Sequence, residues 1–230
     1  LKELFPNWST DSRRALAITG TDEGFRQSMV EVYANLTRHM PDNGAQIVMF
    51  THQDAGVWAD LAMILWAAGL QVTAAWCIVT ETDSGKKIGN YVQGTVLLVL
   101  RKQTSEETAF LDELASEVED EVKRQLDAML ALDDEDDPNF VDTDYQLAAY
   151  AAALRVLTKY RQIEDIDTMR ELYRARGAGE KNPLEGVIEN AVKIACDHLI
   201  PQGIDTWIWS QLGPEERFYL KGLEMESHGE

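Results

Sequence analysis

Strand signals and acidic charge are divided unevenly along this 230-residue chain. Residues 1–102 hold 10 acidic and 9 basic residues and nearly all of the runs that are typical of β-strands. Residues 103–230 hold 30 acidic and 12 basic residues, and their apolar residues recur at helical spacing. A chain of this length forms one large domain or two small ones. We therefore predict an α/β domain at 21–102 and an acidic all-α domain at 103–230, with the boundary near Gln103–Thr104.

The first half predicts the order helix, strand, helix, strand, strand. Residues 1–20 read as an irregular lead-in, and the predicted elements are a helix from Thr21 or Asp22 to His39, a strand at Ala45–Phe50, a helix at Asp54–Ala68 and strands at Leu70–Thr80 and Tyr91–Leu100. Because the first strand is almost continuously apolar, we expect it to be covered on both faces in a parallel sheet. Strands linked by a helix are normally parallel, whereas strands joined by a short loop run in opposite directions. The fold class is thus α/β, a partial doubly wound sheet of about three strands followed by an all-α acidic domain.

The second half predicts helices only. A capping-box pattern at Thr104–Glu107 precedes apolar residues at steps of four up to Leu130, which indicates one long helix. The acidic run 133–137 is typical of a solvated connector. Further helices are expected at 143–160, 165–175, 183–200 and 214–226, the third of them capped by Asn182.

Several classes of site and location are disfavoured by what the sequence lacks. It has no G-x-G-x-x-G, P-loop, H-E-x-x-H, C-x-x-C or G-x-S-x-G motif, and its four histidines are scattered, so no metal site is expected. Cys77 and Cys196 lie in apolar runs typical of buried free thiols, which favours a reducing, cytoplasmic setting. No apolar stretch is long enough to span a bilayer, and no signal peptide is evident. Trp58, Trp66 and Trp76 are expected in the core, whereas Trp207 and Trp209 flank a possible docking patch.

The carboxyl edge of the predicted sheet is where a ligand would bind in an open α/β fold. Three segments reach it: Thr51-His52-Gln53, Thr80-Glu81 and the loop 83–90, which contains the paired bases Lys86 and Lys87. Two adjacent lysines in a polar loop suit phosphate contact, although a solvated loop tip is the commoner explanation. His52 is more often structural than catalytic at such a position.

These residues resemble the later part of a bacterial adenine-specific DNA methyltransferase, more narrowly the large methylases of anti-phage defence islands. The similarity covers roughly residues 20–226 and is carried by the segments 42–52, 68–73, 94–102, 142–150 and 216–223, with Trp58, Trp76 and Thr80-Glu81.

The resemblance implies an S-adenosylmethionine-dependent enzyme with a Rossmann-like sheet that methylates an adenine amino group in DNA, in restriction-modification or phage defence. It implies that this chain supplies the fifth to seventh strands and a docking domain. The family's glycine-rich cofactor loop and its Pro-Pro-Tyr-type loop are both missing, so the cofactor site and every catalytic residue are expected outside this chain, which should be inactive alone. The DNA-side candidates are Thr51, His52, Gln53, Glu81, Lys86, Lys87, Asn90 and Tyr91.

The acidic half should repel phosphates, so we expect it to bind the rest of the methylase or another defence protein, while DNA is bound through the parent enzyme and no membrane is involved. Two alternatives stay open. One is an acidic protein-interaction module or DNA mimic that binds a basic partner, and the other is an intact small α/β protein with an unrelated ligand.

Overall fold

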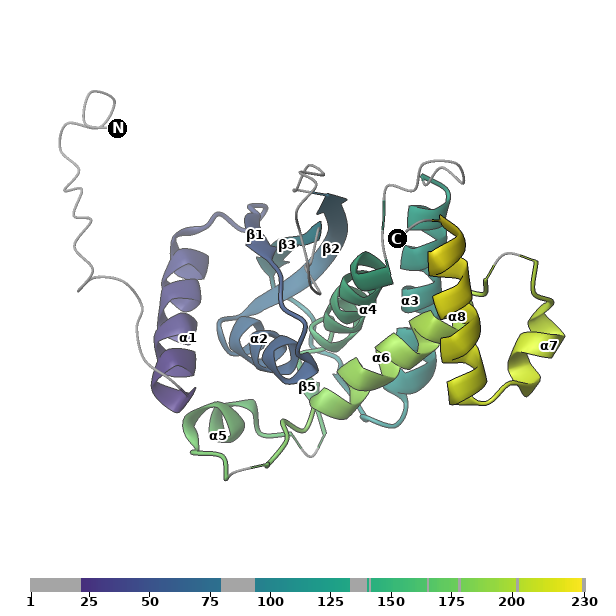
Figure 1. Ribbon diagram of the computed structural model, residues 1–230. Helices are drawn as coiled ribbons and strands as arrows, with labels where there is room; N and C mark the ends of the chain where they lie inside the picture. Colours follow the sequence, from purple (N-terminus) through teal and green to yellow (C-terminus); the bar gives the residue numbers. More distant parts are fainter. Residues whose placement is uncertain are drawn as a thin grey trace, which may run out of the picture.

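The structure is a mixed α/β fold built around a small three-stranded sheet (Figure 1). The computed structural model describes residues 22–79, 94–132, 140, 142–164, 166–177, 179–201 and 203–228. The predicted lead-in at 1–20 and the acidic connector at 133–137 lie outside these residues. Within the part described, no helix is both long and apolar enough to cross a lipid bilayer.

The elements of the first half follow the predicted order. They are α1 (Asp22–His39), β1 (Gln46–Phe50), α2 (Ala55–Ala67), β2 (Leu70–Val79) and β3 (Gly94–Lys102). Helix α2 begins where the Asp54 carboxylate accepts hydrogen bonds from the backbone N–H groups of Gly56 and Val57. It ends before Gly69, whose φ of 74° lets the chain turn into β2.

The sheet has the order β1-β3-β2, and β3 is antiparallel to both neighbours. Strands β1 and β2 therefore run in the same direction and are linked through α2, as predicted, but β3 lies between them. The antiparallel pairing of the last two strands is also confirmed. This register brings the carboxyl ends of β1 and β2 to the start of β3, since Phe50 is paired with Val96 and Val79 with Gly94.

One prediction about β1 is wrong, because the strand is neither paired with a parallel neighbour nor covered on both faces. Helices α2 and α4 (Asp142–Leu157) pack on the face that carries Val96, Leu98 and Leu100, all fully buried. The opposite face carries Ile47 and Met49, which are 56% and 58% exposed. Trp76 lies on this open face too, so its predicted place in the core is also wrong.

The second half departs from the all-α prediction at one point. Two short segments, β4 (Thr108–Ala109) and β5 (Gln162–Ile163), form a parallel two-stranded sheet. The predicted long helix accordingly starts late, as α3 (Leu114–Leu130), because the Ser105 hydroxyl accepts a hydrogen bond from the Glu107 N–H and closes a turn instead.

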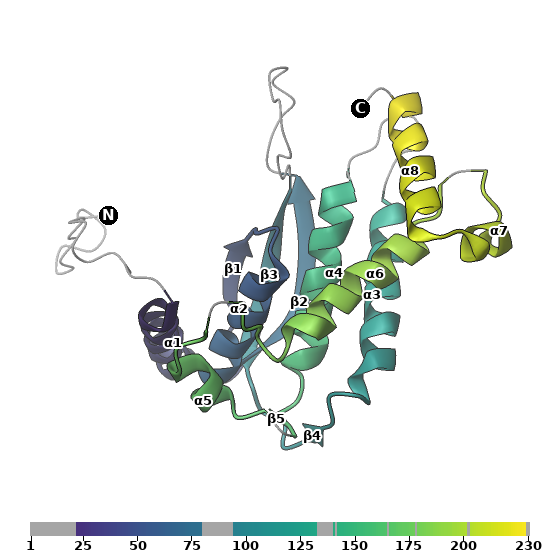
Figure 2. The same ribbon diagram turned by 60° about the horizontal axis from the view of Figure 1, so that its bottom comes forward.

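The remaining helices are α5 (Thr168–Tyr173), α6 (Glu185–His198), α7 (Thr206–Gln211) and α8 (Pro214–His228). With α4 they correspond to the predicted helices, except that α7 was not predicted. Helices α7 and α8 lie beyond the end of α6, on the far side of the molecule from α1 (Figure 2).

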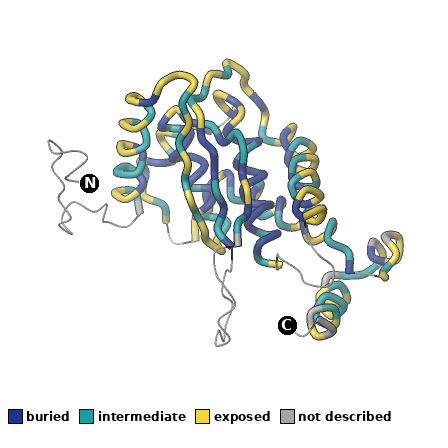
Figure 3. Tube along the Cα trace, turned by 90° about the horizontal axis from the view of Figure 1, so that it is seen from above, coloured by how far each residue is buried: buried dark blue, intermediate teal, exposed yellow. Residues whose placement is uncertain are grey.

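The two halves share one hydrophobic core, which runs from Val30 to Ala195. The tube in Figure 3 shows this buried interior between the strands and the helices. Two buried hydrogen bonds cross the predicted domain boundary: Val72 N–H donates to the Thr158 hydroxyl at 2.9 Å, and Trp66 Nε1 donates to the Tyr160 carbonyl at 2.9 Å. The two halves are thus packed against each other, and the domain boundary near Gln103–Thr104 stays a prediction.

Candidate functional site

The carboxyl ends of β1 and β2 and the start of β3 meet at one edge of the sheet. Thr51, His52 and Gln53 follow β1 there, and all three are exposed. The Thr51 hydroxyl lies 3.4 Å from the Gly94 carbonyl, to which it donates. The other predicted residues, Glu81, Lys86, Lys87, Asn90 and Tyr91, lie outside the described residues, in the segment that connects the paired ends Val79 and Gly94.

His52 has a structural role in the turn after β1. Its Nδ1 accepts a hydrogen bond from the Asp54 N–H at 3.0 Å, and its carbonyl accepts one from Trp58 Nε1 at 2.7 Å. Trp58 is fully buried, with its ring edge-on to Phe50 at 4.8 Å between centroids. The histidine therefore helps to shape the cap of α2, which agrees with the structural explanation for it.

Helix α4 holds the same turn from the other side. The Tyr150 hydroxyl donates to the Gln53 carbonyl at 3.0 Å and accepts from Gln146 Nε2 at 2.8 Å. Burial is the main cause that raises the pKa of Tyr150, with the charges of Asp54 and Glu189 acting in the same direction and the hydrogen bond from Gln146 opposing them. Tyr150 is thus a neutral phenol at pH 7 and can act as this donor.

A buried carboxylate beneath the edge was missed by the sequence reasoning. Asp144 is fully buried in the first turn of α4, and a Cβ atom on Gly94 would overlap its Oδ1 and lie 3.1 Å from Cys77 Sγ. Burial, and secondarily the charge of Asp144, raises the pKa of Cys77 to about 12. The Cys77 thiol is therefore protonated and unsuited to nucleophilic chemistry. The available signal was the run of polar residues at the start of the predicted helix.

Cys196 does not fit the prediction of two buried thiols. It lies on α6, and its residue surface is exposed, whereas Cys77 is buried. Both cysteines are free, as expected. The prediction failed because Cys196 lies on the side of α6 that faces away from the core, a side that also carries Lys193 and Asp197.

Acidic side chains dominate the described part of this edge. Glu185 approaches the Asp54 cap, since a Cβ on Gly56 would lie 3.0 Å from Asp54 Oδ1 and 3.3 Å from Glu185 Oε2. The nearby base Lys181 is already paired with Glu185 at 3.2 Å and with Glu189 at 2.5 Å. An acidic edge repels phosphate, so DNA contact here would depend on the loop lysines.

A cavity of about 560 Å³ lies elsewhere, along the outer edge of β2. Its lining is mostly polar and charged and comes from β2, α3, α4 and the residues just after α4, with Thr73, Arg155 and Lys159 among its members. The bases are engaged: Arg155 pairs with Glu121 at 2.6 Å and Lys159 with Glu117 at 3.0 Å. The charges of this cavity therefore balance one another across its walls.

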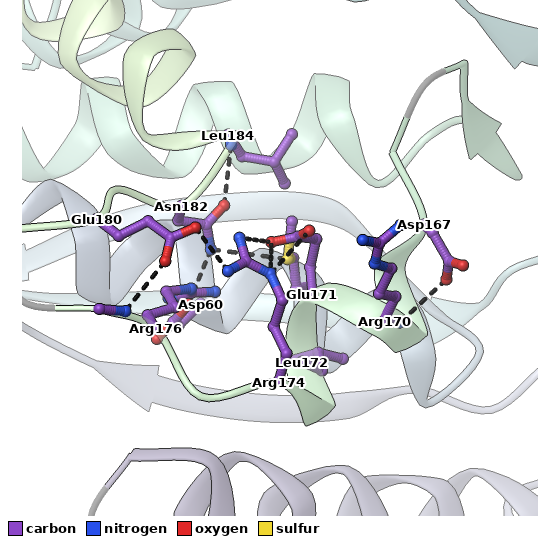
Figure 4. Close-up of polar contacts among 12 residues, drawn as sticks. Asp60, Asp167, Arg170, Glu171, Leu172, Arg174, Arg176, Glu180, Asn182 and Leu184 are labelled. Atoms are coloured by element: carbon purple, nitrogen blue, oxygen red, sulfur yellow. Dashed lines mark hydrogen bonds and ion pairs between the residues drawn. The ribbon is translucent and has the colours of Figure 1, made fainter.

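A polar cluster around Asp60, on the side of α5, joins the two halves (Figure 4). The Asp60 carboxylate accepts from Arg176 at 2.6 Å and from Asn182 at 2.8 Å, and Arg26 Nη1 lies 3.6 Å away. Arg174 pairs with Glu171 and Glu180 in the same cluster. The cluster fastens the segment after α5 to α1 and α2, which is a structural role.

Comparison of the chain with protein-family models, curated proteins and solved structures finds no match. Among the described residues, no group of three or more histidine, cysteine, aspartate or glutamate side chains is placed to hold a metal ion. The assignment of a function therefore depends on the fold and on the resemblance given above.

Proposed function

We propose that this chain is the C-terminal part of an S-adenosylmethionine-dependent DNA methyltransferase that modifies adenine amino groups in restriction-modification or phage defence. In this proposal β1, β2 and β3 are the fifth, sixth and seventh strands of the parent sheet. The helical second half binds the rest of the methylase or another defence protein. The setting would be the cytoplasm.

The observation that carries the proposal is the difference between the two edges of the sheet. The outer edge of β2 is covered, since Val72 N–H bonds to Thr158 and the Ala75 carbonyl accepts from Gln125 Nε2 at 3.1 Å. Among the described strands, none pairs with the outer edge of β1. An uncovered edge strand is an aggregation hazard that proteins normally avoid. A further strand of the parent enzyme, paired with β1, would remove this hazard.

Apolar side chains around β1 support the same proposal. Ile47 and Met49 project from its open face, and Phe25, Val32 and Leu36 are exposed on α1. Exposed apolar residues gathered on one element favour a surface that is covered in the complete protein. A longer sheet with helices on both faces would cover them.

The described residues do not fit the cofactor. The turn at Thr51–Asp54 is closed by hydrogen bonds from its own residues and from Tyr150, and Glu185 lies near its Asp54 carboxylate. The chain also lacks a glycine-rich loop after a strand, so the cofactor site and the catalytic residues are assigned to the preceding polypeptide.

The test compares this chain with the natural protein read from its complete reading frame. The complete protein should contain a Pro-Pro-Tyr-type loop before Leu1 and should transfer tritiated methyl groups from S-adenosylmethionine to unmethylated DNA. The 230-residue chain should give no saturable calorimetric signal with the cofactor. Micromolar cofactor binding by this chain, or a complete frame without such a loop, would show the proposal to be wrong.

The loop lysines provide a second readout in the complete enzyme. Lys86→Ala with Lys87→Ala should weaken DNA binding and flatten its salt dependence, because each phosphate contact releases counterions. Binding that is unchanged across a salt series would remove these lysines from the DNA-side surface.

A DNA mimic is less well supported, because mimicry needs free carboxylates in rows. Carboxylates of α3 are instead paired with bases: Glu117 with Lys159, Glu119 with Lys123, Glu121 with Arg124 and Arg155, and Asp127 with His198.

A further inference from the structure

Helix α8 presents an apolar face to solvent. Phe218 and Tyr219 are 82% and 65% exposed, and Leu223 is exposed beside them. At 100° per residue these three residues share one side of the helix with Gly222. A Cβ atom built on Gly222 would meet no other atom within 4 Å, so this side of the helix is open. Large exposed aromatic side chains at helical spacing are typical of a protein-binding surface.

The opposite side of α8 holds the helix to the body. Arg217 pairs with Asp197 of α6, donates to the Trp209 carbonyl and lies over the Trp209 ring. Lys221 pairs with Glu224 and lies 3.9 Å from Asp142. These contacts turn the aromatic face outward. Arg217 and Lys221 are both engaged in ion pairs on the inner side of the helix.

Helix α7 adds a second pair of exposed apolar residues. Trp207 is 71% exposed and Ile208 is half exposed, whereas Trp209, which is also in α7, is buried. Of the two tryptophans expected to flank a docking patch, Trp207 is exposed, whereas Trp209 is buried and anchors α7 to α8 through Arg217. Helices α7 and α8 together are called the C-terminal arm.

The charge around the outer face selects the kind of partner. Glu215 and Glu226 are exposed on the same side of α8 as the aromatic residues, one near each end. An antiparallel second copy would bring Glu215 against its partner's Glu226, and the formal charge of -19 opposes self-association. DNA and anionic membranes are repelled for the same reason.

We propose that the outer face of α8, with the exposed residues of α7, is a docking surface for a basic amphipathic helix of a partner protein. Its apolar residues would pack on Phe218, Tyr219 and Leu223, and its flanking lysines or arginines would lie near Glu215 and Glu226. This inference deepens the docking role proposed for the helical second half, but it depends only on α7 and α8 and would stand if the methyltransferase assignment failed.

The probe is a fluorescein-labelled amphipathic peptide of about 18 residues, with leucines at helical spacing and lysines on both flanks. Fluorescence anisotropy should give saturable binding to the 230-residue chain. Phe218→Ser with Tyr219→Ser should weaken binding at least about 10-fold, because aromatic side chains dominate such interfaces. Glu215→Gln with Glu226→Gln should weaken it less and reduce its salt dependence.

Matched controls remove exposed apolar residues elsewhere. Phe110 and Leu132 are both exposed and lie outside α7 and α8, so Phe110→Ser and Leu132→Ser should leave the affinity for the peptide unchanged. A peptide with glutamates in place of the lysines should not bind.

Three results would overturn the proposal: equal affinity in the aromatic variant and the controls, a dimer of the wild-type chain that the aromatic variant converts to monomers, and binding to phosphatidylserine vesicles that the same variant abolishes. Each variant should remain folded because these positions are on the surface, and circular dichroism checks this.

Discussion

At the scale of single residues, the most constrained position described is Gly94 at the start of β3. Its lack of a side chain leaves room for the buried carboxylate of Asp144 and for the Cys77 thiol. The close approach lets the first turn of α4 pack directly against the carboxyl edge of the sheet.

Gly94→Ala should therefore destabilise the protein by about 1–3 kcal/mol, because the new methyl group overlaps a buried carboxylate that has little room to move. Urea denaturation measures the change. Gly24→Ala is the matched control, since a Cβ there meets nothing within 4 Å and alanine favours the helix. A Gly94→Ala protein as stable as wild type would show that Asp144 can be displaced without cost.

Asp60 is the residue on which the polar cluster on the side of α5 depends. Asp60→Ala removes the partner shared by Arg176, Asn182 and Arg26, and Arg26 is almost completely buried. We expect a loss of about 3 kcal/mol, because a buried cation without its partner is costly.

The control for this change is Glu106→Gln, which breaks the exposed pair with Arg161 and should cost less than about 1 kcal/mol. Thermal unfolding measures both variants. Equal midpoints for them would mean that the Asp60 cluster contributes no more than a surface pair.

At the scale of elements, ion pairs that depend on pH join α3 to α4 and to the residues just after α4. Burial tends to raise the pKa of Glu121, but hydrogen bonds from Arg124 and Arg155 outweigh it and leave this pKa lowered. The hydrogen bond from the Tyr160 hydroxyl is the main cause that lowers the pKa of Glu117, with a contribution from Lys159.

Because these pKa values are lower in the folded state than the ordinary 4.5, the two carboxylates stabilise the protein above pH 4.5. That contribution is lost as the pH falls through the lowered values. Glu121→Gln should cost about 1 kcal/mol at pH 7, and the difference from wild type should vanish at the acid end of a pH series of thermal melts.

Asp120→Asn, on the exposed side of the same helix, is the control and should change the stability little at pH 7. A Glu121→Gln deficit that persists at low pH would assign the effect to packing rather than charge.

The helices of the second half were predicted where apolar residues recur at helical spacing over several turns. Asp167 caps α5 and Asp205 caps α7 through a carboxylate, but α7 has only six residues, too few to show that spacing, and it was missed. Asn182 was predicted as the cap of α6, and its Oδ1 does accept from the Leu184 N–H at 2.8 Å, although the helix begins at Glu185. The capping-box pattern at Thr104–Glu107 failed because Gln103 and Ser105 bind nearby backbone groups and the following residues pair with Gln162–Ile163.

At the scale of the whole molecule, one core joins the sheet and the helices, while α1, the open edge of β1 and the α7–α8 arm all present apolar residues to solvent. Strand β1 lies on the side of the sheet nearer α1, and α7 and α8 lie on the other side of the molecule (Figure 1). The open edge and the arm can therefore serve different partners without interfering, the first within the proposed methylase and the second on a basic protein.

The sequence by itself determined the order of the sheet-forming elements, the relative directions of β1, β2 and β3, and most helices, because these follow from local periodicity, capping residues and loop lengths. Only the tertiary structure decided that β3 lies between β1 and β2, that Trp76, Ile47 and Met49 face solvent, and that Asp144 is buried beneath Gly94. Such facts depend on which surfaces meet across distant parts of the chain, and an apolar side chain has the same local pattern whether or not a neighbour covers it.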